Sequence, residues 1–132
     1  MTLDIINPDD LGVPRGWNNG MLAPAGGRVL FVAGQTAADA DGVVTPVGLV
    51  AQWERALERV LLVVRDAGGG PEHIGRLTIY VTDLAAYRAH RKQIGEVYRR
   101  LMGRHFPAMA LVEVTGLVDE QALLEMEATA VI

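Results

Sequence analysis

The chain has 132 residues, a formal net charge of −4 and a pI of about 5.3, and half of its residues are hydrophobic. This length suits one domain with a hydrophobic core, so we expect a single domain over residues 1–132. The chain contains no cysteine and no serine, which excludes disulfides, thiolate metal sites and Ser or Cys nucleophiles. The acidic pI argues against nucleic acid as the main partner.

The N-terminal residues indicate neither a secretory signal nor a membrane anchor. Residues 1–7 contain no basic region and no apolar stretch of the signal-peptide kind, and no apolar run reaches membrane-spanning length. We therefore expect a cytoplasmic protein without membrane association. The mean hydropathy of +0.21 is high for a small chain and predicts that some apolar surface is covered in an oligomer.

The first predicted elements are two strands and an amphipathic helix. Residues 21–25 and the β-branched run 28–33 predict strands, joined by a hairpin turn at the two glycines between them. Thr45 and Pro46 then open a helix as its N-cap and first residue, and this helix ends at the glycine triplet 68–70.

A strand, a helix and two closing strands follow. Residues 76–82 alternate between apolar and polar side chains, which predicts a half-buried strand. Asp83 caps the next helix, which is expected over 84–102. Residues 108–115 and 123–132 predict the last two strands.

The predicted fold class is α+β, with a mixed sheet. Gly95 lies inside the second helix at a cost of about 1 kcal/mol relative to alanine, so we expect a close packing contact or a local break there. Two amphipathic helices can cover only one face of the sheet. The other face also carries apolar side chains, and self-association would cover it.

Neither a metal site nor a nucleic-acid surface is favoured by the basic residues and histidines. The three histidines are scattered without metal-ligand spacing, so we expect no metal. Six of the twelve basic residues lie between Arg88 and Arg104 and form a strip on the second helix. No aromatic residue interrupts this strip for base stacking, which favours a solvated helix face over an RNA-binding surface.

Carboxylates on the last two strands are the remaining candidates for chemistry. Glu125 and Glu127 share one face of an apolar strand, and Glu113 is a third candidate on the neighbouring strand. Like charges at this spacing can raise one carboxyl pKa and create a proton acceptor, although a solvated strand edge explains the same pattern more often. The residues alone therefore predict an oligomeric α+β domain with a candidate carboxylate site.

Four short strings, in order along the chain, resemble the Rid (YjgF) family. The order and spacing match from about residue 15 onward. The strings and their family counterparts are residues 31–35 ("SGQ"), residues 67–68 with 80–84 ("AG … vyl-x-DL"), residues 106–108 with 112–114 ("FPAR-x-x-VEV") and residues 125–128 ("EIEA").

This resemblance implies an architecture and an activity. The family fold is similar to the trimeric chorismate mutases: a mixed sheet with two helices on one face, assembled as a homotrimer with ligand clefts between neighbours. Archetypal members hydrolyse reactive enamines and imines, releasing ammonia and a 2-keto acid, and need no metal or cofactor. Such hydrolysis uses a positioned water and a proton relay, which agrees with the missing nucleophiles.

The resemblance also assigns site residues. Glu125 stands at the carboxylate proposed to hold the attacking water. Trp17 stands where the family usually has a tyrosine that walls the cleft, and Gly34 at the glycine whose backbone lies beside the ligand. Gln35 is the neighbour of that glycine, and Ala33 replaces the usual serine.

One substitution predicts an altered substrate specificity. Met109 stands where the family's arginine clamps the substrate carboxylate, and with Glu113 it completes the expected binding residues. Losing that charge-assisted contact costs about 1.5–3 kcal/mol, on the order of tenfold to a few hundredfold in affinity. Arg15, Arg28 or Arg104 from a neighbouring chain could replace it. The alternative functions are a small-molecule-binding or regulatory trimer without catalysis and, more weakly, an RNA-acting protein.

Overall fold

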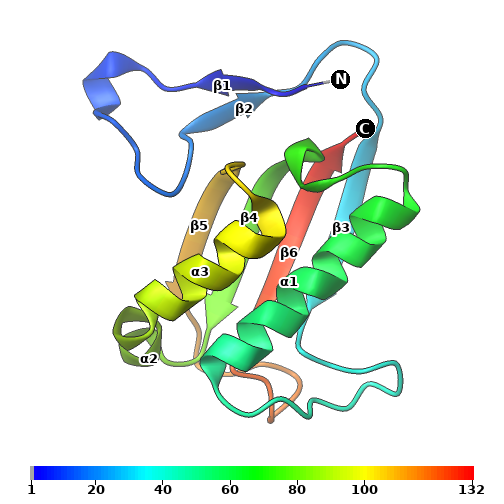
Figure 1. Ribbon diagram of the computed structural model, residues 1–132, viewed down its shortest axis with the longest axis vertical. Coiled ribbons are helices and arrows are strands. Elements are labelled where there is room, and N and C mark those ends of the chain that lie inside the picture. The colour runs from blue at the N-terminus through cyan, green and yellow to red at the C-terminus, as the bar shows by residue number, and fades with distance from the viewer. Residues whose placement is uncertain (1) are drawn as a thin grey trace.

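A four-stranded mixed sheet carries the helices on one face in the computed structural model, which describes residues 2–132 (Figure 1). The strand order is β3 (Val29–Gln35), β6 (Leu124–Val131), β4 (Ile74–Val81) and β5 (Ala108–Glu113). Strand β6 is antiparallel to both of its neighbours, whereas β4 and β5 are parallel. The predicted α+β class and mixed sheet are confirmed.

Helices α1 (Leu49–Asp66) and α3 (Arg91–Met102) cover this face because each carries an apolar stripe. The short helix α2 (Leu84–Ala89) precedes α3, and a 3-10 turn at Pro71–His73 precedes β4. Alternate residues of the strands point toward the helices and form the core with them. The largest fully buried side chains include Leu57, Leu61, Ile74, Leu77, Leu124 and Met126. Among residues 2–132, no helix covers the opposite face of the sheet.

The N-terminal region differs from the predicted hairpin. Strand β1 (Asp4–Ile6) pairs with β2 (Gly20–Leu22) in a separate two-stranded sheet, and a 3-10 turn at Asp9–Leu11 lies between them. Strand β3 pairs with β6 instead of with residues 21–25. Pro24 offers no donor to a ladder, whereas pairing with β6 buries the apolar side of β3 in the core. The predicted hairpin is therefore wrong.

Helix α1 begins later than the sequence indicates. Its N-cap is Gly48, at φ +88°, so the predicted cap at Thr45 is wrong. Glycine is the residue that adopts this left-handed conformation most readily, and it sets the direction in which the helix starts. The Gln52 side chain donates to the Pro46 carbonyl at 3.1 Å, which holds Pro46 outside the helix.

The second predicted helix is divided in two. Asp83 caps α2 as expected, because its Oδ1 accepts a hydrogen bond from the backbone N–H of Ala86 at 3.1 Å. The division falls at His90, whose backbone leaves the helical conformation at φ −113° and ψ 17°, while its N–H still donates to the carbonyls of Ala86 and Tyr87. Gly95 continues α3, and a Cβ placed there would meet nothing within 4 Å. Neither a close contact nor a break is found at Gly95.

Every helix among residues 2–132 is too short or too polar to cross a membrane.

Candidate functional site

Most of the predicted site residues fall into two groups, on opposite faces of the sheet. Glu125 lies between Leu124 and Met126, which are fully buried beneath the helices, so its side chain projects from the uncovered face. Met109 is in register with the buried Leu77 of β4 and therefore lies on the helix-covered face. The structure thus separates the carboxylate from Met109 within one chain.

The first group is centred on Glu125 and Gly34. The pairing of β3 with β6 shifts between Val32 and Gln35, which is a β-bulge beside Glu125. At this bulge the carboxylate packs directly on Gly34: a Cβ added to that glycine would lie 2.5 Å from Oε2 of Glu125. Only glycine accommodates the carboxylate in this position. The exposed Ala33 precedes it in the bulge.

Tyr80 and Glu127 flank this group. Tyr80 is in register with Glu125, and its hydroxyl donates to Oε1 of Glu127 at 2.8 Å. That hydrogen bond is the main cause that raises the pKa of Tyr80 above its ordinary value of 10.0, and the charges of Glu127 and Glu125 act in the same direction. Among the described residues, Glu125 itself has no hydrogen-bond or ion-pair partner, so its carboxylate is free to hold a water or a ligand.

The second group lies in a pocket of about 540 Å³ on the helix-covered side, beside β5. Met109 and Trp17 both line it. The segment that carries Trp17 is fixed by its neighbour Asn18, whose side-chain amide donates to the Phe106 carbonyl at 2.6 Å and whose backbone N–H donates to the Pro107 carbonyl at 3.1 Å. These bonds join two segments that are far apart in the sequence and keep Trp17 over the pocket.

Two aromatic pairs form the walls of this pocket. Trp53 stacks on Tyr87 with a centroid distance of 5.7 Å, and Tyr98 stacks on Phe106 at 5.3 Å. The Tyr98 hydroxyl donates to the His105 carbonyl at 2.7 Å. Burial raises the pKa of Tyr98 far above its ordinary value, so the phenol stays protonated. The pocket therefore has rigid apolar walls.

Gln35 and Glu113 belong to neither group. Each side chain accepts a hydrogen bond from another element of the fold. Oε1 of Gln35 accepts from Nε of Arg59 on α1 at 3.1 Å, which ties β3 to that helix. Oε1 of Glu113 accepts from the backbone N–H of Leu84 at 2.9 Å and so caps the start of α2. Glu113 is in register with the buried Val81, so it faces away from Glu125.

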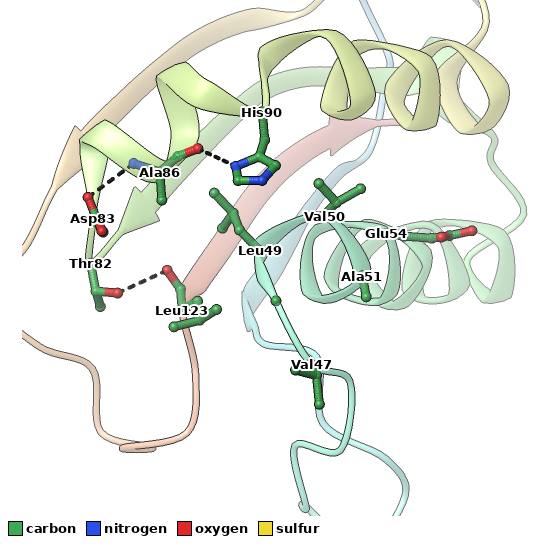
Figure 2. Close-up of a pocket in the computed structure, with 11 residues that line it drawn as sticks. Val47, Leu49, Val50, Ala51, Glu54, Thr82, Asp83, Ala86, His90 and Leu123 are labelled. Carbon is green, nitrogen blue, oxygen red and sulfur yellow. Dashed lines mark hydrogen bonds between the residues drawn. The ribbon is translucent and has the colours of Figure 1, made fainter.

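A second concavity, also of about 540 Å³, lies between the start of α1 and α2 (Figure 2). Figure 2 shows hydrogen bonds between its lining residues: Asp83 with Ala86, His90 with Ala86, and Thr82 with Leu123. None of the predicted site residues lines this concavity.

The metal-ligand candidates, the basic strip and the three candidate replacement arginines lie in different parts of the structure. Among residues 2–132, no group of three or more histidine, aspartate or glutamate side chains is arranged to hold a metal ion. In the basic strip, Arg100 pairs with Glu54 of α1 at 2.6 Å. Of the three arginines predicted to replace the missing anchor, Arg15 lines the pocket of Trp17 and Met109, whereas Arg28 and Arg104 do not.

Known proteins are similar to this chain over most of its length. Residues 16–132 match the family model described as Endoribonuclease L-PSP. The chain is 31% identical over 105 residues to a RutC family protein of Pyrococcus abyssi, covering 79% of each. It is 28% identical over 105 residues to the 2-iminobutanoate/2-iminopropanoate deaminase of Capra hircus, covering 79% of this chain and 73% of the relative. The crystal structure of the Rid-family protein YyfB from Yersinia pestis matches with a TM-score of 0.87 at 29% identity, over 100% of both chains.

Proposed function

The chain belongs to the Rid (YjgF) family, and on this premise we propose that it hydrolyses reactive imines or enamines, or related small C–N compounds, with an altered substrate specificity. The observation that carries the proposal is the unpartnered Glu125 carboxylate, which lies on Gly34 at the β-bulge. The deaminase name of the caprine relative supports the reaction class.

The proposed reaction needs one water and one proton acceptor. Glu125 accepts a proton from the water as its oxygen bonds to the imine carbon, and the nitrogen gains a proton to give a carbinolamine. The C–N bond then breaks and ammonia leaves, while the hydroxyl loses its proton and becomes a carbonyl. The net change is imine plus water to carbonyl compound plus ammonia. The Gly34 backbone lies beside the reacting group, and Trp17 and Met109 shape the pocket.

In the proposed assembly, a homotrimer brings the two groups of site residues together. They lie on opposite faces of one sheet, so a carboxylate of one protomer and a pocket of the next would complete each cleft. The uncovered face supports this arrangement because it carries apolar side chains: Phe31 is 80% exposed, Val29 55% and Val112 45%. The ligand would be a small molecule held between protomers.

The test is hydrolysis of 2-iminobutyrate and 2-iminopropionate generated in situ, followed by a wider panel of imines. We expect Glu125→Gln to lower the rate by about 10²–10⁴-fold, the usual contribution of a positioned acid or base. Glu127→Gln is the matched control on the same face of the same strand, because glutamine still accepts the Tyr80 hydrogen bond.

The outcomes separate the proposal from its alternatives. Turnover of panel imines other than the two simplest would support altered specificity. If Glu125→Gln keeps the full rate, Glu125 is not the proton acceptor. If no imine reacts faster than in buffer, the hydrolase proposal is wrong. Saturable ligand binding without turnover would then favour the binding or regulatory trimer.

A further inference from the structure

Three arginine side chains surround the pocket that contains Trp17 and Met109. Arg15 comes from the segment before Trp17, and Arg91 and Arg99 come from α3. All three are exposed, and within residues 2–132 none of them forms a side-chain hydrogen bond or an ion pair. A guanidinium group carries five donors and no acceptor, so an unpaired one at the rim of a pocket is available to an anion.

The spacing along α3 places two of these arginines on the same side of the helix. Arg91, Gly95 and Arg99 are four residues apart and share one face, with the two arginines about 12 Å apart along the helix axis. Gly95 lies between them and also lines the pocket, and no atom lies within 4 Å of where its Cβ would be. The helix therefore leaves open space between two cationic side chains.

The interior of the same pocket is apolar and aromatic. Its lining includes five of the seven aromatic residues of the chain. Met109 lies among them and cannot bind a carboxylate. Within this lining, the buried indole N–H of Trp53 has no acceptor among the described residues. A cationic rim above an aromatic interior fits a molecule with one anionic end and one large apolar end.

We propose that Arg91 and Arg99, together with Arg15, bind the carboxylate of a substrate whose aromatic or large apolar side chain enters this pocket. The inference rests on the proposed function and narrows it, because it selects imines of bulky amino acids over those of small ones. The substrate carboxylate is then bound by the arginines of helix α3, while Met109 contacts the apolar part of the substrate.

Binding can be measured separately from turnover with 3-phenylpropanoate and its neutral amide, 3-phenylpropanamide. Both tryptophans of the chain, Trp17 and Trp53, line the pocket, so intrinsic fluorescence reports occupancy, and calorimetry provides a second readout. We expect the acid to bind at least about tenfold more tightly than the amide, as a charge-assisted hydrogen bond implies.

Substitutions then assign the preference to the arginines. We expect Arg91→Gln with Arg99→Gln to remove most of the preference for the acid, with Arg15 retaining the rest, and to leave the affinity for the amide unchanged. Arg65→Gln is the matched control, because Arg65 is exposed in the last turn of α1 and lies outside the pocket. Gly95→Leu should weaken binding of both compounds by filling the space, while leucine favours the helix.

The results distinguish this inference from the proposed function. Equal affinity for acid and amide, no binding of either at millimolar concentration, or a preference that survives the double substitution undiminished overturns the arginine site. Turnover of the phenylalanine-derived imine that is insensitive to both arginine substitutions would also overturn it while leaving the hydrolase proposal intact. Arginine-dependent binding of the acid without turnover of any imine would retain the site and reject the hydrolase.

Discussion

Gly34→Ala tests whether the position of the Glu125 carboxylate matters for catalysis. An alanine Cβ at this position would lie 2.5 Å from Oε2 of Glu125, whereas ordinary van der Waals contact begins at 3.4 Å, so the carboxylate must move by 3.4 − 2.5 = 0.9 Å or more. A displacement of about 1 Å in a reacting group can cost on the order of 100-fold in rate. We therefore expect kcat/KM for imine hydrolysis to fall by about 100-fold.

The fold should tolerate this substitution. Gly34 does not have a positive φ, and the clashing atoms belong to the free end of a side chain, so we expect the free energy of unfolding to change by less than about 1 kcal/mol. Denaturant unfolding checks this expectation. In a double-mutant cycle with Glu125→Gln, Gly34→Ala should lower kcat/KM little further. A Gly34→Ala protein that keeps kcat/KM within about threefold would refute the reasoning, because the catalytic rate would then not depend on the carboxylate position.

Three further predictions concern stability and assembly. Gly95→Ala should raise the free energy of unfolding by about 0.5–1 kcal/mol in a urea titration, because the added methyl meets nothing; the comparison Gly103→Ala, at φ +66°, should lower it. The pKa of Tyr98 is raised in the folded chain, so the unfolded chain releases this proton at a lower pH. The free energy of unfolding should therefore keep this contribution below pH 10 and fall as the pH rises from there toward the folded-state pKa. Tyr98→Phe should remove this part of the alkaline loss, and an unchanged dependence of the free energy of unfolding on pH would contradict the assignment. Phe31→Glu should convert the proposed trimer to a 14.2 kDa monomer in sedimentation analysis, and a wild-type monomer would rule out that trimer.

The elements β4 and α1 could be predicted because their patterns of apolar residues extend over many positions. The alternation over residues 76–82 and the stripe of the first helix correspond to β4 and α1 with small differences at the ends. Strand β1 could not be found in this way, because its three residues are all exposed and carry no burial pattern. The boundary at His90 lies where the backbone of a single residue leaves the helical conformation, which periodicity does not reveal.

The candidate site was predicted in part. The resemblance paired Glu125 with Gly34, and the structure places them in contact. It did not reveal that Met109 and Glu113 lie on the other face, because that depends on the register of β5 against β4. Tyr80 could have been included from its position on the polar side of its strand. The arginines of α3 were interpreted as part of a solvated strip, since a helical spacing does not show which side meets a pocket.

The central position of β6 has a consequence for how the chain reaches its native state. This strand is the last in sequence order, yet it provides the only hydrogen-bonded link between β3 and the β4–β5 pair within the described residues. During synthesis from the N-terminus, residues 124–131 leave the ribosome after all the other strands, so the sheet cannot close until then. Assembly of this sheet therefore waits for its last strand and is expected to be comparatively slow, since it depends on contacts between distant parts of the sequence.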